Sequence, residues 1–200
     1  MGKLGLTLDL TGRVPIMSGR GIRADIIHYG AGLFFVQFDQ NFDTDEYIVG
    51  ATITGGVSIN PQAAEITAFK IGSGTFFWTA VDDVPTDLKL DIDFAVISQT
   101  TQSCAMVDGG IVPTMQATRG FKANIERLGI GYVRLVFDAP LAPNEYAVNA
   151  VIREPWAPGL RYVIVAVKGM VGDIAFIDVM TWSNSAQADL SFDIFTERFR

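Results

Sequence analysis

Histidine and cysteine are almost missing from this 200-residue sequence, which contains one of each, His28 and Cys104. One cysteine can form no disulfide within the chain and no thiolate cage around a metal ion. One histidine removes the usual zinc sites and most serine or cysteine triads, which need a histidine base. We therefore expect no catalytic residue, no metal site and no bound cofactor.

Long apolar runs and clustered basic residues are missing as well. No stretch approaches the roughly 18 consecutive apolar residues that a membrane-spanning helix requires. The segment Met1–Leu10 lacks the basic start and unbroken apolar run of a signal peptide, so we expect synthesis in the cytoplasm. The net charge of −7 argues against binding to a phosphate backbone, which uses clustered Lys and Arg. We expect neither membrane insertion nor a nucleic acid partner.

The residues that are plentiful are typical of a β-protein. Hydrophobic residues make up 49% of the chain and charged residues only 18%, so the chain can bury one large core or two small ones. Apolar and polar positions alternate with a period of two in residues 33–38, 88–96 and 132–137. Turn residues recur every 8 to 15 positions or so, which is the spacing of strands in a sandwich. We predict an all-β fold with roughly six to eight strands per domain.

An internal repeat organises the chain. At an offset of 99 residues, Gly21–Ile53 aligns with Gly120–Ile152 without a gap, and 12 of the 33 positions are identical, where chance gives about two. The repeat extends to weaker matches on both sides, namely Val14–Met17 with Val112–Met115, Ile66–Lys70 with Ile164–Lys168, and Leu90–Asp93 with Leu190–Asp193. We predict two tandem β-sandwich or jelly-roll domains related by internal duplication, residues 1–104 and 105–200, joined by a polar connection at Ser98–Gly110.

The centre of each repeat predicts a local structure. A strand that ends at Phe38 or Phe137 is expected to enter an exposed hairpin turn, and the next strand is expected to begin at Tyr47 or Tyr146. Turn-forming residues lie between them, Asn41, Asp43 and Asp45 in the first copy and Pro140 and Pro143 in the second. Glycines precede the strand in both copies, at Gly30 and Gly32 and at Gly129 and Gly131, and predict a positive φ or a close backbone approach.

The repeated segment resembles one that recurs in bacteriophage fibre and virion-surface proteins. It reads as a Gly-x-Gly lead, an alternating strand ending in Phe-Asp, a turn and then Tyr-x-Val, which in the second copy spans Gly129 to Val148. The first copy departs from this pattern, because Leu33 stands where the second has Tyr132 and the turn prolines are missing. Such phage domains are similar to the trimeric knobs of complement-type and tumour-necrosis-factor-like proteins.

The resemblance implies a structural role on a virion and no catalytic residue. It implies a homotrimer that contacts other virion proteins of the capsid or tail. Two domains fill the 200 residues and leave no room for a long shaft, so a short fibre, a head spike and a capsid-decorating protein are the roles that fit. Host surface glycan is a further expected partner.

Aromatic residues are the candidates for receptor or subunit contacts, namely Tyr132, Trp156, Trp182 and Phe199. Trp156 lies in the proline-rich segment Glu154–Gly159, where an exposed indole would stack on a sugar ring; packing or subunit contact is the competing interpretation. Phe195 and Phe199 stand close to the last residue of the sequence, and we expect a partner subunit to cover them.

The other candidates have simpler interpretations. His28 is interpreted as part of a solvated loop, because its counterpart is Arg127, and Cys104 as an inert free thiol in the connection. Trp78 is assigned to the core or an interface. Carboxylates are interpreted as turn or solvated strand residues in preference to calcium ligands or a glycosidase pair; they are Asp43, Asp45, Glu46, Asp82, Asp83, Asp91 and Asp93.

Two other functions compete with the structural role. A soluble, lectin-like tandem carbohydrate-binding module would gain avidity from its two copies and would use Trp156 or its neighbours. A depolymerase acting through Asp91 or Asp93 has less support, because no set of acid, base and nucleophile is evident.

Overall fold

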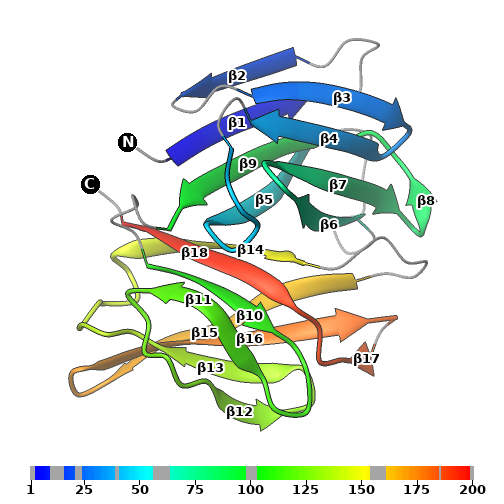
Figure 1. Ribbon diagram of the computed structural model, residues 1–200. Helices are drawn as coiled ribbons and strands as arrows, with labels where there is room; N and C mark the ends of the chain where they lie inside the picture. Colours follow the sequence, from blue (N-terminus) through cyan, green and yellow to red (C-terminus); the bar gives the residue numbers. More distant parts are fainter. Residues whose placement is uncertain are drawn as a thin grey trace.

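The computed structural model describes residues 3–9, 16–20, 24–38, 41–55, 64–97, 103–153, 161–184 and 186–198 (Figure 1). Within these ranges the chain forms strands, turns and irregular segments and no helix, so the predicted all-β class is confirmed.

Nine strands are described in each half of the chain, more than the six to eight that were expected. Those of the first half are β1 (Lys3–Asp9), β2 (Ile16–Arg20), β3 (Ala24–Gly30), β4 (Leu33–Phe38), β5 (Tyr47–Gly55), β6 (Ala64–Ile71), β7 (Gly74–Val81), β8 (Val84–Pro85) and β9 (Lys89–Val96). Those of the second half are β10 (Cys104–Asp108), β11 (Thr114–Arg119), β12 (Glu126–Gly129), β13 (Tyr132–Val136), β14 (Tyr146–Ile152), β15 (Arg161–Val171), β16 (Ile174–Ser183), β17 (Ala186–Gln187) and β18 (Phe192–Arg198). The two-residue strands β8 and β17 are too short for an alternation to indicate them.

Each half is a β-sandwich, and the strand order is the same in both. In the first half, a sheet ordered β2-β1-β9-β5 faces strands ordered β6-β7-β4-β3. In the second half, strands ordered β11-β10-β18-β14 face a sheet ordered β15-β16-β13-β12. A single parallel bridge between Thr67 of β6 and Ile152 of β14 joins the inner sheets of the two sandwiches. Figure 1 shows the first sandwich at the top and the second below it.

Each sandwich has its own apolar core, as the alternation predicted. In the first, Phe34, Val36 and Phe38 of β4 face β5 and β9 across the core, whereas Leu33 and Gln37 lie on the opposite side of β4 and are partly exposed. The second core is formed in the same way by residues of β10, β13, β14, β16 and β18. Because side chains on successive strand positions point to opposite faces, the pattern could be read from the sequence.

The segment between β4 and β5 is not a hairpin, contrary to the expectation. β4 pairs with β3 and β7, whereas β5 pairs with β9 in the opposite sheet. The chain therefore crosses from one layer of the sandwich to the other. The crossing lets the rings of Phe38 and Tyr47 meet edge to face in the core, 5.8 Å apart. The second copy crosses in the same way between β13 and β14.

The second glycine of each Gly-x-Gly lead combines a positive φ with a close backbone approach. Gly32 and Gly131 have φ values of 67° and 56°. A Cβ at Gly32 would lie 2.2 Å from the Thr79 carbonyl oxygen, and one at Gly131 would lie 2.6 Å from that of Thr181. Gly30 has a φ of 159° and open space around its Cβ position, whereas Gly129 has neither a positive φ nor a close backbone approach. The prediction of a positive φ or a close backbone approach is thus confirmed for Gly30, Gly32 and Gly131 and is wrong for Gly129.

Matched contacts in the two halves support the predicted duplication, which stays a prediction. The N–H of Gly32 donates to Asp87 Oδ1 at 2.7 Å, and that of Gly131 donates to Asp189 Oδ1 at the same distance. Asp87 and Asp189 are 102 residues apart, whereas Leu90–Asp93 was matched with Leu190–Asp193 at an offset of 100. That match is therefore wrong by two residues. The strand register agrees with this correction, because Tyr47 pairs with Val96 and Tyr146 pairs with Arg198.

The polar connection predicted at Ser98–Gly110 contains a buried strand. Residues 98–102 lie outside the described residues, but Cys104 to Val107 belong to β10 and have no exposed surface. Two neighbouring strands, β11 and β18, hydrogen-bond β10. A short apolar run between polar residues is sufficient for a buried strand. The domain boundary at residues 104/105 stays a prediction.

Candidate functional site

The two sandwiches meet in a junction with its own apolar cluster. Its buried members are Ile48 of β5, Cys104 and Met106 of β10, and Phe195 of β18. Phe195 approaches the backbone of Gly50 so closely that a Cβ there would lie 2.1 Å from its ring. The expectation that a partner subunit covers Phe195 is therefore wrong, because the first half of the same chain covers it.

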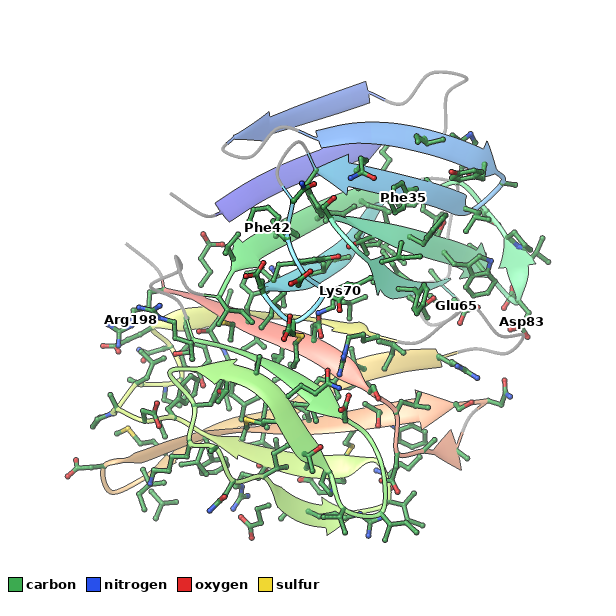
Figure 2. All side chains as sticks on the ribbon, viewed as in Figure 1. Phe35, Phe42, Glu65, Lys70, Asp83 and Arg198 are labelled. Atoms are coloured by element: carbon green, nitrogen blue, oxygen red, sulfur yellow. The ribbon has the colours of Figure 1, made fainter. Side chains whose placement is uncertain are left out.

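A buried ionic cluster spans the same junction, and Figure 2 shows one of its members, Lys70, between the two sandwiches. Lys70 of β6 lies 2.9 Å from Asp193 Oδ2 of β18, and the two side chains are 3% and 0% exposed. Lys70 also donates to the Tyr47 carbonyl oxygen at 2.9 Å, and the Val49 N–H donates to Asp193 Oδ2 at 3.3 Å. Burial lowers the pKa of Lys70, and the adjacent carboxylate of Asp193 opposes that shift.

Arg153 completes the cluster from the second half. Its Nε lies 3.1 Å from Asp193 Oδ1, and its guanidinium also pairs with Asp108 and donates to Gln116 Oε1 at 2.6 Å. The cluster thus holds two cations and two carboxylates, so its charges balance. Each carboxylate oxygen of Asp193 thus lies beside a cation, and such pairing offsets the cost of burying the charges.

Glu65 of β6 is a second buried acid at the boundary between the halves. Its side chain is 2% exposed, and Oε2 accepts a hydrogen bond from the Arg161 N–H at 2.7 Å, whereas Oε1 has no hydrogen-bond partner. Burial raises the pKa of Glu65 to about 7, and the nearby carboxylate of Asp83 acts in the same direction. Sequence reasoning missed Glu65, because one acid in a strand gives no signal of its surroundings.

We expect Glu65 to make stability fall as the pH rises. The folded pKa of about 7 exceeds the unfolded value, so the contribution is fully present below pH ~4.5 and is lost as pH rises through 7. In urea unfolding at pH 5 to 8, the free energy of unfolding of Glu65→Gln should rise relative to that of the wild type as pH increases. The difference should reach up to about 1.4 kcal/mol for each unit by which the pKa of Glu65 is raised. Parallel pH profiles of the two proteins would contradict this assignment.

Of the four predicted contact residues, the described part of the chain includes two, Tyr132 and Trp182, which lie on neighbouring strands. Tyr132 of β13 is half-buried, with its hydroxyl 3.4 Å from Asp178 Oδ2. Trp182 of β16 is also half-buried and lies two residues beyond Met180, the partner of Tyr132. Trp156 and Phe199 lie outside the described residues. A receptor or subunit role for these four residues stays a prediction.

The sequence suggested that His28 lies in a loop, but the residue belongs to strand β3. Its Nε2 lies 3.0 Å from Asp87 Oδ1, and its counterpart Arg127 lies 2.9 Å from Asp189 Oδ2. His28 in the first half and Arg127 in the second thus occupy equivalent positions beside equivalent aspartates. Each of these aspartates also accepts the N–H of the second glycine of the Gly-x-Gly lead. The conserved geometry explains why the sequence varies there between His and Arg.

Glu46 closes a turn, as predicted. Its Oε2 accepts the Asp43 N–H at 2.9 Å, and in the second copy Glu145 Oε2 accepts the Ala142 N–H at 3.2 Å. Across the described part of the chain, no three His, Cys, Asp or Glu side chains gather as they would around a metal ion. The side chains of Asp91 and Asp93 lie outside the description.

Cys104 and Trp78 are both buried. Burial raises the pKa of the Cys104 thiol to about 12, which agrees with an inert thiol, although the residue lies in β10 and not in a connection. Trp78 of β7 is 6% exposed, in agreement with its assignment to the core or an interface.

Several exposed apolar side chains lie on the outward side of the first sandwich. We call this surface the aromatic face; it consists of the exposed Ile27, Tyr29, Phe69 and Ile71 together with the half-buried Phe76 and the buried Phe35. The ring of Phe76 lies 4.6 Å from that of Phe35 and 5.6 Å from that of Tyr29. Tyr29 is 58% exposed. The alternating pattern in β3, β4, β6 and β7 could have indicated this face, because both sides of β4 are apolar.

A second exposed apolar surface is the end of the β15–β16 hairpin. We call it the hairpin tip, and it consists of Met170, Val171 and Ile174. Val171 is 71% exposed. The hairpin projects beyond the second sandwich (Figure 1, lower left).

Comparisons with known proteins add no identity. No family model, no curated protein and no solved structure matches this chain. In the described ranges there is no helix long and apolar enough to span a membrane.

Proposed function

We propose that this chain is a non-enzymatic structural protein of a bacteriophage virion, a short fibre, a head spike or a capsid-decorating protein, which assembles as a homotrimer on the particle surface. The observation that carries the proposal is the open apolar surface, in particular the aromatic face. Contiguous apolar patches of several hundred square ångströms mark sites of protein–protein contact in soluble proteins.

The junction between the sandwiches supports the same role. Apolar side chains and balanced buried charges fix the two halves to each other, which suits a rigid building block. In a chain without disulfides, burial between subunits adds to the stability of each subunit. The sequence resemblance to virion-surface proteins supplies the setting, and no catalytic group is assigned to the described residues.

Purified particles of the phage that encodes this chain provide the test. Mass spectrometry should find the chain in the particles, and an antibody raised against it should label their surface in electron micrographs. If the chain were missing from intact particles and present only in the lysate, the virion role would be wrong.

A tandem carbohydrate-binding module is the second candidate. The observation in its favour is the exposed ring of Tyr29 beside Phe76, because flat exposed rings can stack on sugars. Binding of glycans that Tyr29→Ala abolishes, by a protein with the mass of a single chain, would favour this candidate over the structural role.

A further inference from the structure

We propose that the chain assembles by inserting the hairpin tip of one copy onto the aromatic face of the next. The occupant of the aromatic face is thus a second copy of this chain. The inference rests on the proposed function, because it names the surfaces through which the proposed homo-oligomer forms.

The fold itself does not require an apolar outward face. In the first sandwich, one row across four strands consists of Ile27, Phe35, Phe76 and Phe69, each paired with the next by the sheet register. The corresponding row of the second sandwich consists of Glu126, Arg134, Asp178 and Val167. The same sandwich therefore folds with either row.

The three charged residues of this second row pair with one another within the chain. Arg134 binds Asp178 through two hydrogen bonds, Nε to Oδ1 at 2.6 Å and Nη2 to Oδ2 at 2.9 Å. Its guanidinium also stacks on the ring of Phe176, 4.0 Å from the ring centre. Arg134 Nη1 lies 3.8 Å from Glu126 Oε2. At this row the second sandwich presents paired charges and one exposed valine, Val167, whereas the first sandwich presents only apolar side chains.

The hairpin tip is an addition that only the second sandwich has. Lys70 of β6 pairs with Thr75, and its counterpart Lys168 of β15 pairs with Ile177. Beyond this position the first hairpin continues for one pair, Ile71 with Gly74, whereas the second continues for three. The two extra pairs contribute exposed apolar side chains and a turn with one charge, Asp173.

The two surfaces are both apolar and exposed, and they are divided between the halves. Each chain has one projecting apolar tip and one flat apolar face, and in the structure both are exposed, so neither fills the other within a chain. Figure 1 places the tip at the far end of the lower sandwich, and Figure 2 places Phe35 in the upper one. A tip-to-face contact is heterologous, and such contacts repeat into a closed ring, such as a trimer, or into a filament.

Mixing of two variants tests the pairing directly. The face variant carries Ile27→Lys with Tyr29→Lys, and the tip variant carries Val171→Lys with Ile174→Lys; all four positions are exposed. Sedimentation should show each variant alone as a single chain of 21.7 kDa. An equal mixture should form a two-chain complex and nothing larger, because only one intact tip and one intact face can meet.

A matched control separates this contact from a general effect of added lysines. Ile111→Lys with Val112→Lys changes two side chains that are 83% and 78% exposed elsewhere, and this variant should keep the wild-type mass. Circular dichroism should show the wild-type fold for all three variants, and the control variant should also keep the wild-type unfolding midpoint, because it alone stays assembled.

The outcomes distinguish this inference from the proposed function. If the wild type is an oligomer and both variants keep its mass, the assignment of the surfaces is wrong while assembly stands. If only the face variant dissociates, the faces pair with each other and the tip has no part. If the wild type is a single chain at every concentration, both proposals fail.

Discussion

Replacing Lys70 by methionine is expected to lower the free energy of unfolding by about 3–5 kcal/mol, the cost of removing one partner from a buried ion pair. Methionine retains the length of the side chain but leaves the fully buried carboxylate of Asp193 without its nearer cation. The Tyr47 carbonyl oxygen loses its donor at the same time. Urea unfolding at one fixed protein concentration measures the loss.

The chain supplies its own control for this substitution. Lys168 occupies the corresponding position of the second sandwich and donates to the Tyr146 carbonyl oxygen at 3.0 Å, but its side chain is exposed. Lys168→Met removes one hydrogen bond and should cost about 0.5–1.5 kcal/mol. Equal losses in the two variants would mean that the ionic cluster does not hold the junction.

Replacing Phe195 by alanine is expected to cost about 3–5 kcal/mol, as for other buried phenylalanines. Phe195 is 1% exposed and lies in the apolar cluster between the sandwiches, so its removal leaves a cavity in the junction. Chemical denaturation monitored by tryptophan fluorescence should report a midpoint shifted to lower denaturant.

A second substitution identifies the contact responsible. Gly50→Ala places a Cβ 2.1 Å from the Phe195 ring and should cost about 1–3 kcal/mol through overpacking. In the Phe195→Ala background the same methyl group enters the space that the ring has left, so the double variant should lose less than the sum of the two single losses. Additive losses would show that Gly50 and Phe195 do not meet.

Much of the fold could be predicted from the sequence, because it depends on local patterns. The alternation in Leu33–Phe38 predicted the buried side of β4, and the start of β5 at Tyr47 was also correct. The crossing between these strands could not be predicted, because a turn sequence between two strands fits a hairpin and a change of layer equally well. Pairing partners are set by distant residues.

The junction was missed for a related reason. Lys70 and Asp193 are 123 residues apart, and neither stands out in its own strand. One signal was present, however: at an offset of 102 residues, Asp87-Leu88 and Asp91-Ile92 match Asp189-Leu190 and Asp193-Ile194. That alignment would have indicated the aspartates that bind the glycine turns, and would have placed Asp193 on the outward side of β18.

The exposed surfaces could be predicted only in part. The apolar residues on both sides of β4 are visible in the sequence, but exposure depends on whether another layer covers the sheet. The hairpin tip is visible as extra length in the second repeat, and only the paired registers of β6–β7 and β15–β16 identify which residues were added.

The most direct test of the structural role is the mass of the purified wild-type chain in solution, measured by light scattering over a range of concentrations. We predict an oligomer of defined size, with three chains of 21.7 kDa as the expected mass. A mass of one chain at all concentrations would contradict the account and would favour a soluble binding module.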